Sequence, residues 1–324
     1  MSVLIVIPCL NEAKHIKSLT EQLLADNAAM DMRILIADGG STDGTVDIAL
    51  QLAQAHSQVM YMHNPRRLQS AALNLAVATD GEGCEYLIRI DAHATYPHDY
   101  CAVLLREAQE QKADSVVVAM DTRGITPFQR AVAAAQNSKL GNGGSSHRNL
   151  QGQGKWVDHG HHALMRIDAY KSVGGYDESF SHNEDAELDT RLIKTGKRIW
   201  LTAKTSLIYY PRAAALPLFR QYRGYGSGRV RNLLKHKTKP KLRQMLPVAV
   251  FPAFVLALLS PVCFVFALPL LAWAGLCLAY GMHIARKAKD PVLALSGPAA
   301  MIMHFAWSLG FWQGAYKAVR KGGA

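Results

Sequence analysis

Acidic residues are almost absent from the second half of this sequence. Residues 190–324 contain 21 Lys and Arg but a single acid, Asp290, whereas residues 1–189 contain 15 Lys and Arg against 24 acids. The two halves therefore carry formal charges of +20 and −9, which give the chain its +11. So strong a separation of charge indicates that the second half of the chain meets an anionic partner.

Cysteine is scarce as well. The five cysteines are odd in number and scattered, and two of them lie in the apolar last third of the chain. A disulfide framework or a cysteine-rich metal centre is therefore not expected. The cysteine usage instead indicates a protein of the reducing cytosol. The first residues lack the basic segment that opens a signal peptide, because an apolar strand begins at once.

Two common nucleotide-binding motifs are missing. No Gly-x-Gly-x-x-Gly follows the first apolar run, and no Gly-x-x-x-x-Gly-Lys-Ser/Thr occurs anywhere in the sequence. The first absence disfavours a dinucleotide-binding site, and the second excludes a P-loop.

Apolar runs alternate with helical segments through roughly the first hundred residues. The runs at 3–7, 33–37 and 86–90 are apolar apart from Arg33 and Arg89, which is the character of buried parallel strands. This alternation predicts an α/β fold with a doubly wound, mostly parallel sheet. Ligands bind beyond the carboxyl ends of strands in such sheets, so the polar residues that follow each run are the candidate site residues.

Three polar segments stand at these strand ends. Asp91 and His93 are hard and borderline donors, suited to a divalent ion that also binds phosphate oxygens. The turn Asp38-Gly-Gly-Ser-Thr-Asp-Gly-Thr45 has glycines that allow close approach of a nucleotide to the backbone. Asn64-Pro-Arg-Arg67 places two cations before a helix of small residues. Each segment taken alone is also consistent with an ordinary turn, a helix cap or a solvated surface.

Five motifs in a fixed order resemble one enzyme family. They are Ile7-Pro-Cys-Leu-Asn-Glu12, the turn at 38–45, Asp91-Ala-His93, Gly174-Gly-Tyr-Asp-Glu178 and Asn183-Glu-Asp185. Their order over about residues 2–235 resembles the inverting family 2 glycosyltransferases, which have the GT-A fold and use nucleotide-sugar donors. Asn64-Pro-Arg-Arg67, Leu140-Gly-Asn-Gly-Gly144 and the hydrophobic tail are most similar to the ExoA-type glucosyltransferases of succinoglycan and exopolysaccharide assembly. Those enzymes transfer glucose from UDP-glucose to a polyprenyl-diphosphate-linked sugar.

The resemblance implies a role for each matching residue. Asp185 would be the catalytic base, and Asp38 would accept a hydrogen bond from the uracil ring. Asp91 and His93 would hold Mn²⁺ or Mg²⁺, with His93 in place of the second Asp of the usual Asp-x-Asp. The donor nucleotide would be bound by Pro8, Asn11, Glu12, Asp38, Arg67 and Asp91. One base for the acceptor hydroxyl and one cation for the leaving diphosphate suit inverting transfer.

The acceptor side departs from the family pattern. The Gln-x-x-Arg-Trp of processive synthases stands here as Gln221-Tyr-Arg-Gly-Tyr225, with Gly224 in place of the arginine. The resemblance therefore implies a non-processive enzyme. Its acceptor contacts would come from Glu184, Gln221, Arg223 and Arg229.

Three histidines, His159, His161 and His162, have no assigned role. They fit a contact with the metal or the diphosphate, or a contact with solvent or acceptor. A separate zinc site is not expected, because no cysteine lies near them.

The tail is strongly apolar. Residues 246–281 carry no charge, and one bilayer span takes about 20 residues. The run predicts either a hairpin, which Pro261 and Pro269 favour, or one long tilted helix. A second apolar stretch at 292–315 would leave Lys317 and Arg320 on the wrong side if it spanned. The second stretch therefore fits a re-entrant or interfacial helix. The remaining alternative is that the apolar segments form a pair of core helices in a soluble protein.

The position of the basic run at 220–243, directly before the tail, favours anionic lipid headgroups over nucleic acid. We expect a catalytic domain at 1–235. Residues 236–324 would add a basic linker and a membrane segment of two or three hydrophobic helices.

These observations predict an enzyme at the cytoplasmic face of the inner membrane. It would transfer a sugar, glucose by resemblance, from a UDP-sugar to a polyprenyl-diphosphate-linked saccharide, with other exopolysaccharide-assembly proteins as further candidate partners. One alternative is a transferase that makes a polyprenyl-phosphate monosaccharide. The other is a membrane-tethered nucleotide-sugar sensor or scaffold, which would need no acceptor-side base.

Overall fold

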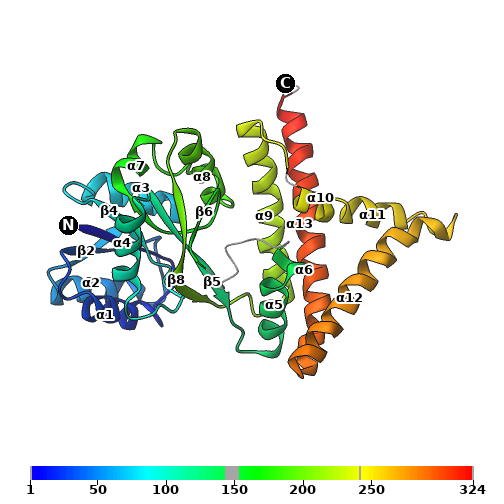
Figure 1. The fold of residues 1–324 in the computed structure, drawn as a ribbon, viewed down its shortest axis with the longest axis horizontal. Coiled ribbons are helices and arrows are strands. Elements are labelled where there is room, and N and C mark those ends of the chain that lie inside the picture. Colours follow the sequence, from blue (N-terminus) through cyan, green and yellow to red (C-terminus); the bar gives the residue numbers. More distant parts are fainter. Residues whose placement is uncertain (1, 143–152, 241, 323–324) are drawn as a thin grey trace. The chain divides into compact units, whose positions relative to one another are not determined.

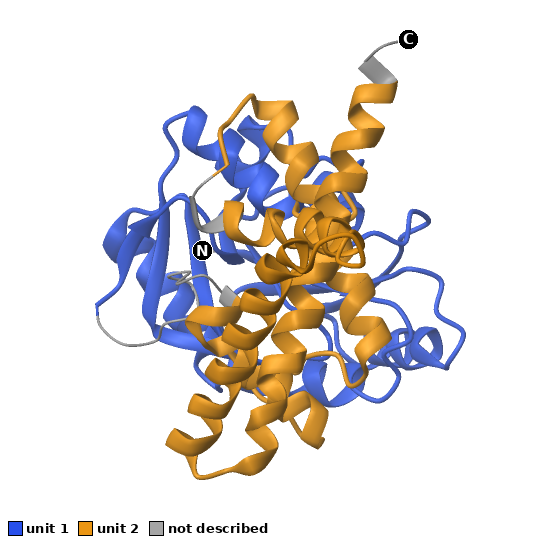
Figure 2. Ribbon diagram, turned by 90° about the vertical axis from the view of Figure 1, so that its right-hand side faces the viewer, with its two compact units in different colours: residues 1–120, 150–179, 184–209 blue, residues 121–149, 180–183, 210–324 orange. Residues whose placement is uncertain are grey.

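Two compact units make up this chain, and the structure, a computed structural model, describes residues 2–142, 153–240 and 242–322. Unit 1 consists of Met1–Met120, Leu150–Ser179 and Glu184–Tyr209, and unit 2 consists of Asp121–Asn149, Phe180–Asn183 and Tyr210–Ala324 (Figure 2). Both units are assembled from separate segments of the chain. The single boundary expected after residue 235 stays a prediction.

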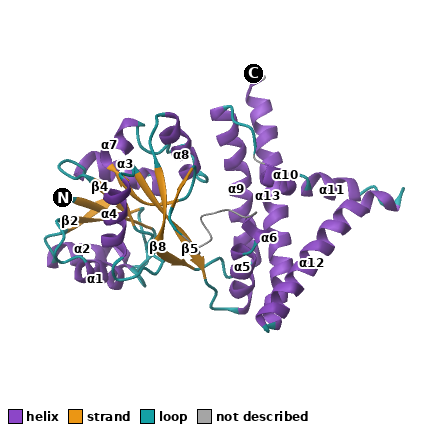
Figure 3. Cartoon of the chain, in the orientation of Figure 1, coloured by secondary structure: helices purple, strands orange, loops and turns teal. Residues whose placement is uncertain are grey.

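Unit 1 is built on an eight-stranded sheet with helices packed on it (Figures 1 and 3). The strand order is β3-β2-β1-β4-β7-β5-β8-β6. The strands are β1 (Val3–Cys9), β2 (Met32–Asp38), β3 (Val59–His63), β4 (Tyr86–Arg89), β5 (Ser115–Thr122), β6 (Lys155–Val157), β7 (His161–Arg166) and β8 (Ile199–Tyr209). The helices are α1 (Ile16–Asp26), α2 (Thr45–Ala55), α3 (Gln69–Asp80), α4 (Tyr100–Gln111), α7 (Ile167–Ser172) and α8 (Glu184–Lys194).

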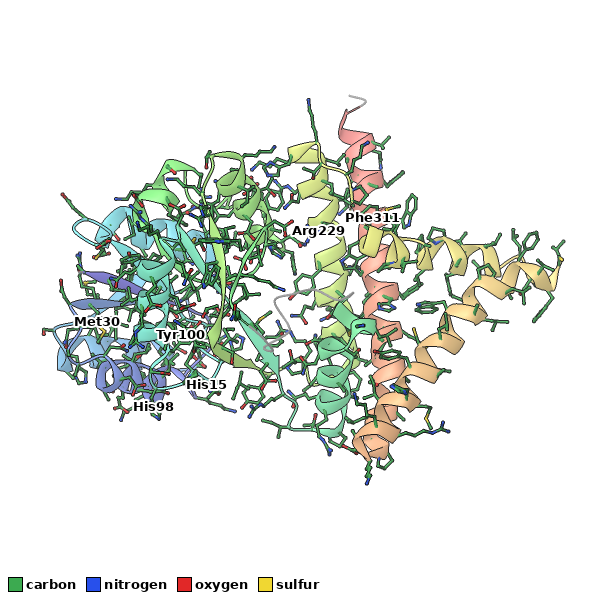
Figure 4. The ribbon with its side chains drawn as sticks, in the orientation of Figure 1. His15, Met30, His98, Tyr100, Arg229 and Phe311 are labelled. Atoms are coloured by element: carbon green, nitrogen blue, oxygen red, sulfur yellow. The ribbon has the colours of Figure 1, made fainter. Side chains whose placement is uncertain are left out.

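The central strands are buried on both faces, which explains their continuous apolar sequence. Successive side chains of β1 point to opposite faces, so Val3, Ile5 and Ile7 join one core cluster while Leu4 and Val6 join the other. The first cluster includes the fully buried Tyr100 on α4 (Figure 4). Strands β1 to β4 are parallel, as the sequence predicts.

The second half of the sheet reverses direction. β7 lies antiparallel between β4 and β5, and β6 pairs antiparallel with β8, so the sheet as a whole is mixed. In the β4–β7 ladder Tyr86 pairs with Arg166 and Ile88 with Leu164. Continued by three residues, this register brings His161 level with Asp91.

Unit 2 is helical. Its helices are α5 (Pro127–Asn137), α6 (Lys139–Asn142), α9 (Ala215–His236), α10 (Leu242–Val248), α11 (Val250–Ala257), α12 (Leu268–Ala288) and α13 (Ser296–Gly322), with 3-10 turns η2 (Phe264–Ala267) and η3 (Pro291–Leu295). The long helices α9 and α13 lie side by side, with Arg229 on the first and Phe311 on the second (Figures 1 and 4).

Glycines bring α9 and α13 into backbone contact. A Cβ on Gly226 would overlap the carbonyl oxygen of Trp307, and a Cβ on Gly310 would overlap that of Arg223. Gly314 would place one 3.3 Å from the Cα of Ser227. The two helices can therefore approach this closely only because these positions carry no side chain.

The uncharged run at 246–281 forms a short helix and a long one. α11 and α12 are joined by a short connection (Figure 3). Pro261 lies in this connection, and Pro269 lies in the first turn of α12. Within the described residues, Phe264–Ala288 and Pro291–Arg320 are long and apolar enough to cross a membrane by length and composition. Many large apolar side chains of α11 and α12 are exposed, among them Val255, Leu271 and Leu276.

Candidate active site

Two carboxylates that are distant in the sequence meet one buried guanidinium in unit 1. Arg89 is the last residue of β4, Asp91 follows it, and Asp185 lies in the first turn of α8. Arg89 Nε donates a hydrogen bond to Asp91 Oδ1 at 3.1 Å, and Arg89 Nη1 donates one to Asp185 Oδ1 at 3.0 Å. We call these three residues the Arg89 bridge.

The bridge is buried at its centre and open at both ends. Arg89 is 7% exposed, whereas the side chains of Asp91 and Asp185 keep 19% and 18% of their surface. Burial alone would lower the pKa of Arg89, but the two carboxylates raise it well above its ordinary value. The arginine is therefore a fixed charge that holds two acids in place, and each acid still faces outward.

Asp185 has a second donor beside the arginine. Tyr176, from the Gly-Gly-Tyr-Asp-Glu motif, donates its hydroxyl to Asp185 Oδ1 at 2.8 Å. Burial favours protonation of Asp185, but Arg89 and then His162 and His161 hold the pKa of this carboxyl far below its usual range. Asp185 is thus ionised, with Oδ1 occupied and Oδ2 free of hydrogen bonds from the described residues.

Glu184 lies next to Asp185 in the first turn of α8, and its pKa is shifted in the opposite direction. Burial and the charge of Asp185 raise the pKa of Glu184. The two neighbouring acids therefore have separate electrostatic environments, and of the two only Asp185 is stabilised as an anion.

Asp91 is fixed on one oxygen and open on the other. Gln69 Nε2 donates to Asp91 Oδ1 at 2.6 Å, beside the bond from Arg89. Asp91 Oδ2 lies 3.6 Å from His161 Nε2. Burial opposes ionisation of Asp91, but Arg89 and then His161 lower the pKa of this carboxyl.

The donor set around Asp91 fits a divalent ion in part. Asp91 Oδ2 and His161 offer an oxygen and a nitrogen, and burial followed by Arg89 lowers the pKa of His161, which favours the neutral ligating form. His93 instead places Nδ1 2.9 Å from Glu12 Oε1. No cluster of three or more candidate ligands converges among residues 2–142, 153–240 and 242–322. Protein ligands here would thus be few, as for Mg²⁺ ions that keep water and substrate oxygens.

The segments at the ends of β1 and β2 are joined to each other. Asn11, in the left-handed region at φ 58°, receives a hydrogen bond from the Thr42 backbone on its Oδ1 at 2.9 Å. Asp38 is fully buried and accepts from the backbone N–H groups of Gly40 and Ser41 at 2.7 and 3.0 Å. Asp38 therefore holds its own turn closed.

Two further predicted donor-site residues lie at this edge. Pro8 lies in β1, where it pairs with Ala37 of β2. Arg67 has φ 56° and lies over the turn, with its Cα 3.4 Å from where a Cβ on Gly39 would be. For an arginine this backbone conformation is unusual, and such strain is concentrated at functional sites.

Two of the three unassigned histidines contact the buried Asp189 of α8. His162 Nε2 lies 2.8 Å from Asp189 Oδ1, and His159 Nδ1 lies 2.6 Å from Asp189 Oδ2. The Ser115 hydroxyl donates to the Leu164 carbonyl and lies 2.9 Å from His162 Nδ1, so His162 is the donor there. Burial lowers the pKa of His162, but Asp189 outweighs this and raises it above its ordinary value, which favours the protonated form.

The remaining predicted acceptor residues, Gln221, Arg223 and Arg229, all lie on α9 in unit 2 (Figure 4 labels Arg229). Gln221 Nε2 donates to the Tyr225 hydroxyl of the same helix at 3.0 Å. Arg223 lines cavities between α9 and α13, and Arg229 does not.

Three residues of the site, Arg89, Gln69 and Tyr176, have no role predicted from the sequence. One signal was available for Arg89, because a charged residue inside a buried apolar strand needs a carboxylate partner. Gln69 offered no such signal. Tyr176 stands in the motif at 174–178, but the motif does not indicate that its hydroxyl contacts Asp185.

Comparison with known proteins gives two sequence relatives across nearly the whole chain. Residues 4–174 match the model of glycosyl transferase family 2. The chain is 59% identical over 312 residues, 96% of this chain and 94% of the relative, to "Succinoglycan biosynthesis protein ExoA" of Rhizobium meliloti (strain 1021). It is 24% identical, over 97% of each chain, to "Dolichyl N-acetyl-alpha-D-glucosaminyl phosphate 3-beta-D-2,3-diacetamido-2,3-dideoxy-beta-D-glucuronosyltransferase" of Methanococcus voltae.

Solved structures share the fold at low sequence identity. The mannosyltransferase PcManGT from Pyrobaculum calidifontis, in complex with GDP-Man and Mn²⁺, has a TM-score of 0.59 and 18% identity over 97% of this chain and 87% of that one. Residues 1–349 of S. aureus TarS give a TM-score of 0.51 and 13% identity over 97% and 92%. These likenesses concern the fold, which is the GT-A fold that the motif order predicts.

Proposed function

Since this chain is a glycosyltransferase that belongs to glycosyl transferase family 2, we propose that it transfers a sugar from a UDP-sugar, with inversion, to a polyprenyl-diphosphate-linked saccharide. The observation that carries the proposal is the Arg89 bridge. It holds one carboxylate at the donor edge of the sheet and one at the start of α8, and both are ionised.

In this proposal Asp185 receives the proton of the acceptor hydroxyl. Its Oδ1 is held by Arg89 and Tyr176, so Oδ2 is the atom that takes the proton. A carboxylate of low pKa is a weak base in the resting enzyme. The hydroxyl becomes acidic as its oxygen bonds to the anomeric carbon, so proton transfer follows bond formation.

Asp91 orients the donor in the same scheme. Gln69 and Arg89 fix its Oδ1, which leaves Oδ2 beside His161 to face the sugar diphosphate. A divalent ion bound there would neutralise charge on the leaving diphosphate as a Lewis acid. His93 would reach this site only by leaving Glu12, so its role as a ligand stays a prediction.

The names of the relatives support the chemical class of the substrates. The name of the R. meliloti relative places it in the synthesis of succinoglycan, an exopolysaccharide, and that of the M. voltae relative includes a dolichyl-phosphate-linked sugar. The Pyrobaculum structure holds a nucleotide sugar with Mn²⁺. These names favour a lipid-linked acceptor, a nucleotide-sugar donor and a divalent ion for this chain.

The exposed apolar surface of α11 and α12 supports attachment to a membrane. Large exposed apolar surfaces on a soluble protein are rare and mark contact with lipid or with another protein. In our proposal this surface enters the cytoplasmic face of the membrane, with basic residues of α9 attracted to anionic headgroups.

The packing of α13 argues against a simple transmembrane span. α13 lies along α9, and α9 carries Arg220, Arg223 and Arg231 on exposed positions. If α13 spanned the bilayer, these charges would be drawn toward hydrocarbon at a cost of about 2.5–3.5 kcal/mol each near its centre. We therefore propose that α11 and α12 insert and that α13 remains at the surface.

The test is a transfer assay on the full-length protein in detergent. Purified enzyme is incubated with a panel of UDP-sugars and a panel of polyprenyl-diphosphate-linked mono- and oligosaccharides, and the lipid products are identified by mass spectrometry. We expect one donor to extend the acceptor by a single residue. Repeated extension would contradict the non-processive assignment, and no transfer from any UDP-sugar would contradict the donor class.

The lipid product of this assay also tests the second candidate function, a polyprenyl-phosphate monosaccharide transferase. A transferase that acts on polyprenyl phosphate would make a monosaccharide phosphate lipid and leave the diphosphate acceptor unchanged. Offering both acceptors in one reaction separates the two functions directly.

A further inference from the structure

Two adjoining cavities between α9 and α13 form a basic trough in unit 2. They have volumes of about 300 and 660 Å³ and share Arg223 and Lys317 among their lining residues. Their size lies in the range of ligand sites. The cations that line the basic trough are Arg220, Arg223, Arg231, Lys317 and Arg320.

Unit 2 is very poor in acidic residues. Its sequence contains two acids, Asp121 and Asp290. Asp121 accepts from Arg123, and Asp290 pairs with Arg130. Like charges gathered in a concave surface focus a positive potential and concentrate anions. The basic trough therefore has the electrostatic character of an anion site.

The trough also explains why the arginine expected at position 224 is replaced by glycine. A Cβ on Gly224 would overlap the imidazole of His182, and His182 itself lines the smaller cavity. A long side chain at 224 would thus compete with His182 for the same space. Lys317, on the facing helix α13, adds a positive charge to the trough, in addition to the arginines of α9.

We propose that the basic trough binds the diphosphate of the lipid-linked acceptor. Arg223 of α9 and Lys317 of α13 would contact the diphosphate from the two facing helices. Charge-assisted hydrogen bonds from arginine and lysine are the usual means of binding phosphate. That the diphosphate belongs to a lipid-linked acceptor rests on the proposed function. That the trough binds a diphosphate rests on the cations that line it. His182 precedes Asp185 by three residues, so a piece of chain of at most about 11 Å connects the lining of the smaller cavity to the proposed base.

The first experiment measures binding of inorganic pyrophosphate to the full-length protein by calorimetry, at low salt and without divalent metal. We expect the wild type to bind, and Arg223→Gln/Lys317→Gln to bind at least about tenfold more weakly. Arg223→Lys/Lys317→Arg keeps both charges and should retain binding. The control variant Arg286→Gln/Lys287→Gln removes two charges from the end of α12, outside the trough, and should bind as the wild type does.

Three results would overturn the proposal. The wild type could fail to bind, the trough and α12 variants could lose affinity equally, or the trough variants could bind normally. Equal loss would mean that pyrophosphate responds to net charge alone. Thermal unfolding of each variant establishes that it is folded, and the charge-retaining pair tests the site even if the glutamine pair is unstable.

A competition experiment identifies the source of the diphosphate. Polyprenyl diphosphate in detergent should displace pyrophosphate, whereas phosphatidylglycerol vesicles at the same phosphate concentration should not. Displacement by the vesicles would make the trough a site for ordinary membrane lipids and would refute the acceptor assignment.

Kinetics then separate this inference from the proposed function. Lys317→Gln should raise the KM for the lipid-linked acceptor about tenfold and leave the KM for the UDP-sugar unchanged. If the wild type transfers no sugar, the proposed function fails while the pyrophosphate result still stands. If the wild type transfers sugar and Lys317→Gln has a normal acceptor KM, the trough assignment alone fails.

Discussion

Arg89 Nη1 donates a hydrogen bond to Asp185 Oδ1 at 3.0 Å, although 96 residues separate the two in the sequence. The same guanidinium holds Asp91 through Nε. The donor edge of the sheet and the proposed base therefore share one buried cation.

Asp185→Asn should lower turnover by about 10²–10⁴-fold, because the amide cannot accept the hydroxyl proton. The KM for the UDP-sugar should change little, and initial rates at saturating acceptor measure the effect. Asp168→Asn is the matched control, since Asp168 is an exposed acid in the first turn of another helix, α7. Turnover near the wild-type rate in Asp185→Asn would remove Asp185 from the catalytic role.

Arg89→Met should destabilise the fold by about 3–5 kcal/mol, because it leaves two partly buried carboxylates without their cation. Urea unfolding followed by circular dichroism measures the change. Arg166→Met breaks an exposed ion pair with Asp168 and should cost no more than about 1 kcal/mol. A similar small cost at both positions would show that the Arg89 bridge does not stabilise unit 1.

The His162–Asp189 pair should make stability depend on pH. Burial alone would lower the pKa of His162, but Asp189 raises it above the unfolded value of about 6.5. A raised folded-state pKa stabilises the fold fully below the unfolded pKa, and this contribution is lost as pH rises through the folded pKa. The free energy of unfolding should therefore fall from pH 6 upward in the wild type, and less in His162→Gln. Identical pH profiles for the two proteins would contradict the charged state of His162.

Metal removal tests the Asp91 site. Excess EDTA should abolish transfer, and Mn²⁺ or Mg²⁺ should restore it, because the leaving diphosphate needs a cation. Asp91→Asn should not be restored at the same metal concentration. We expect His93→Asp to remain active with a changed metal preference. Full activity in EDTA would exclude the metal role.

Gly226→Ala should destabilise unit 2 by about 1–3 kcal/mol, since the added methyl group overlaps the Trp307 carbonyl and must push α13 away. Thermal unfolding in detergent measures the effect. Gly275→Ala on α12 is the matched control, because a Cβ there meets no atom within 4 Å. An unchanged melting temperature for Gly226→Ala would show that the two helices do not depend on this contact.

The strand–helix alternation of unit 1 could be predicted because each element carries its own periodicity. Strands β1, β2 and β4 lie where the apolar runs indicate, and Asp38 and Asp91 stand at their carboxyl ends. The antiparallel β7 between β4 and β5 could not be predicted, because its short sequence carries no sign of its neighbours. That strand brings His161 to Asp91, so the histidine was recognised as a candidate but not placed.

The partners of the site residues were harder to predict than the residues themselves. Asp91 and Asp185 belong to local motifs, whereas their connection through Arg89 depends on a contact between β4 and α8. The pairing of His93 with Glu12 likewise joins the ends of two strands. Such contacts depend on tertiary structure, which spacing along one segment does not encode.

The glycine contact between α9 and α13 has a consequence for how the basic trough can change. Where main chain meets main chain, the distance between the helices is set by backbone atoms and not by the length of any side chain. The width of the trough and its charge are therefore independent variables. Substitutions at Arg223 or Lys317 alter the charge at constant width, whereas substitutions at Gly226 or Gly310 alter the width at constant charge. A family of such enzymes could thus adapt to acceptors of different charge without rebuilding the helix pair, and to bulkier ones by exchanging a single glycine.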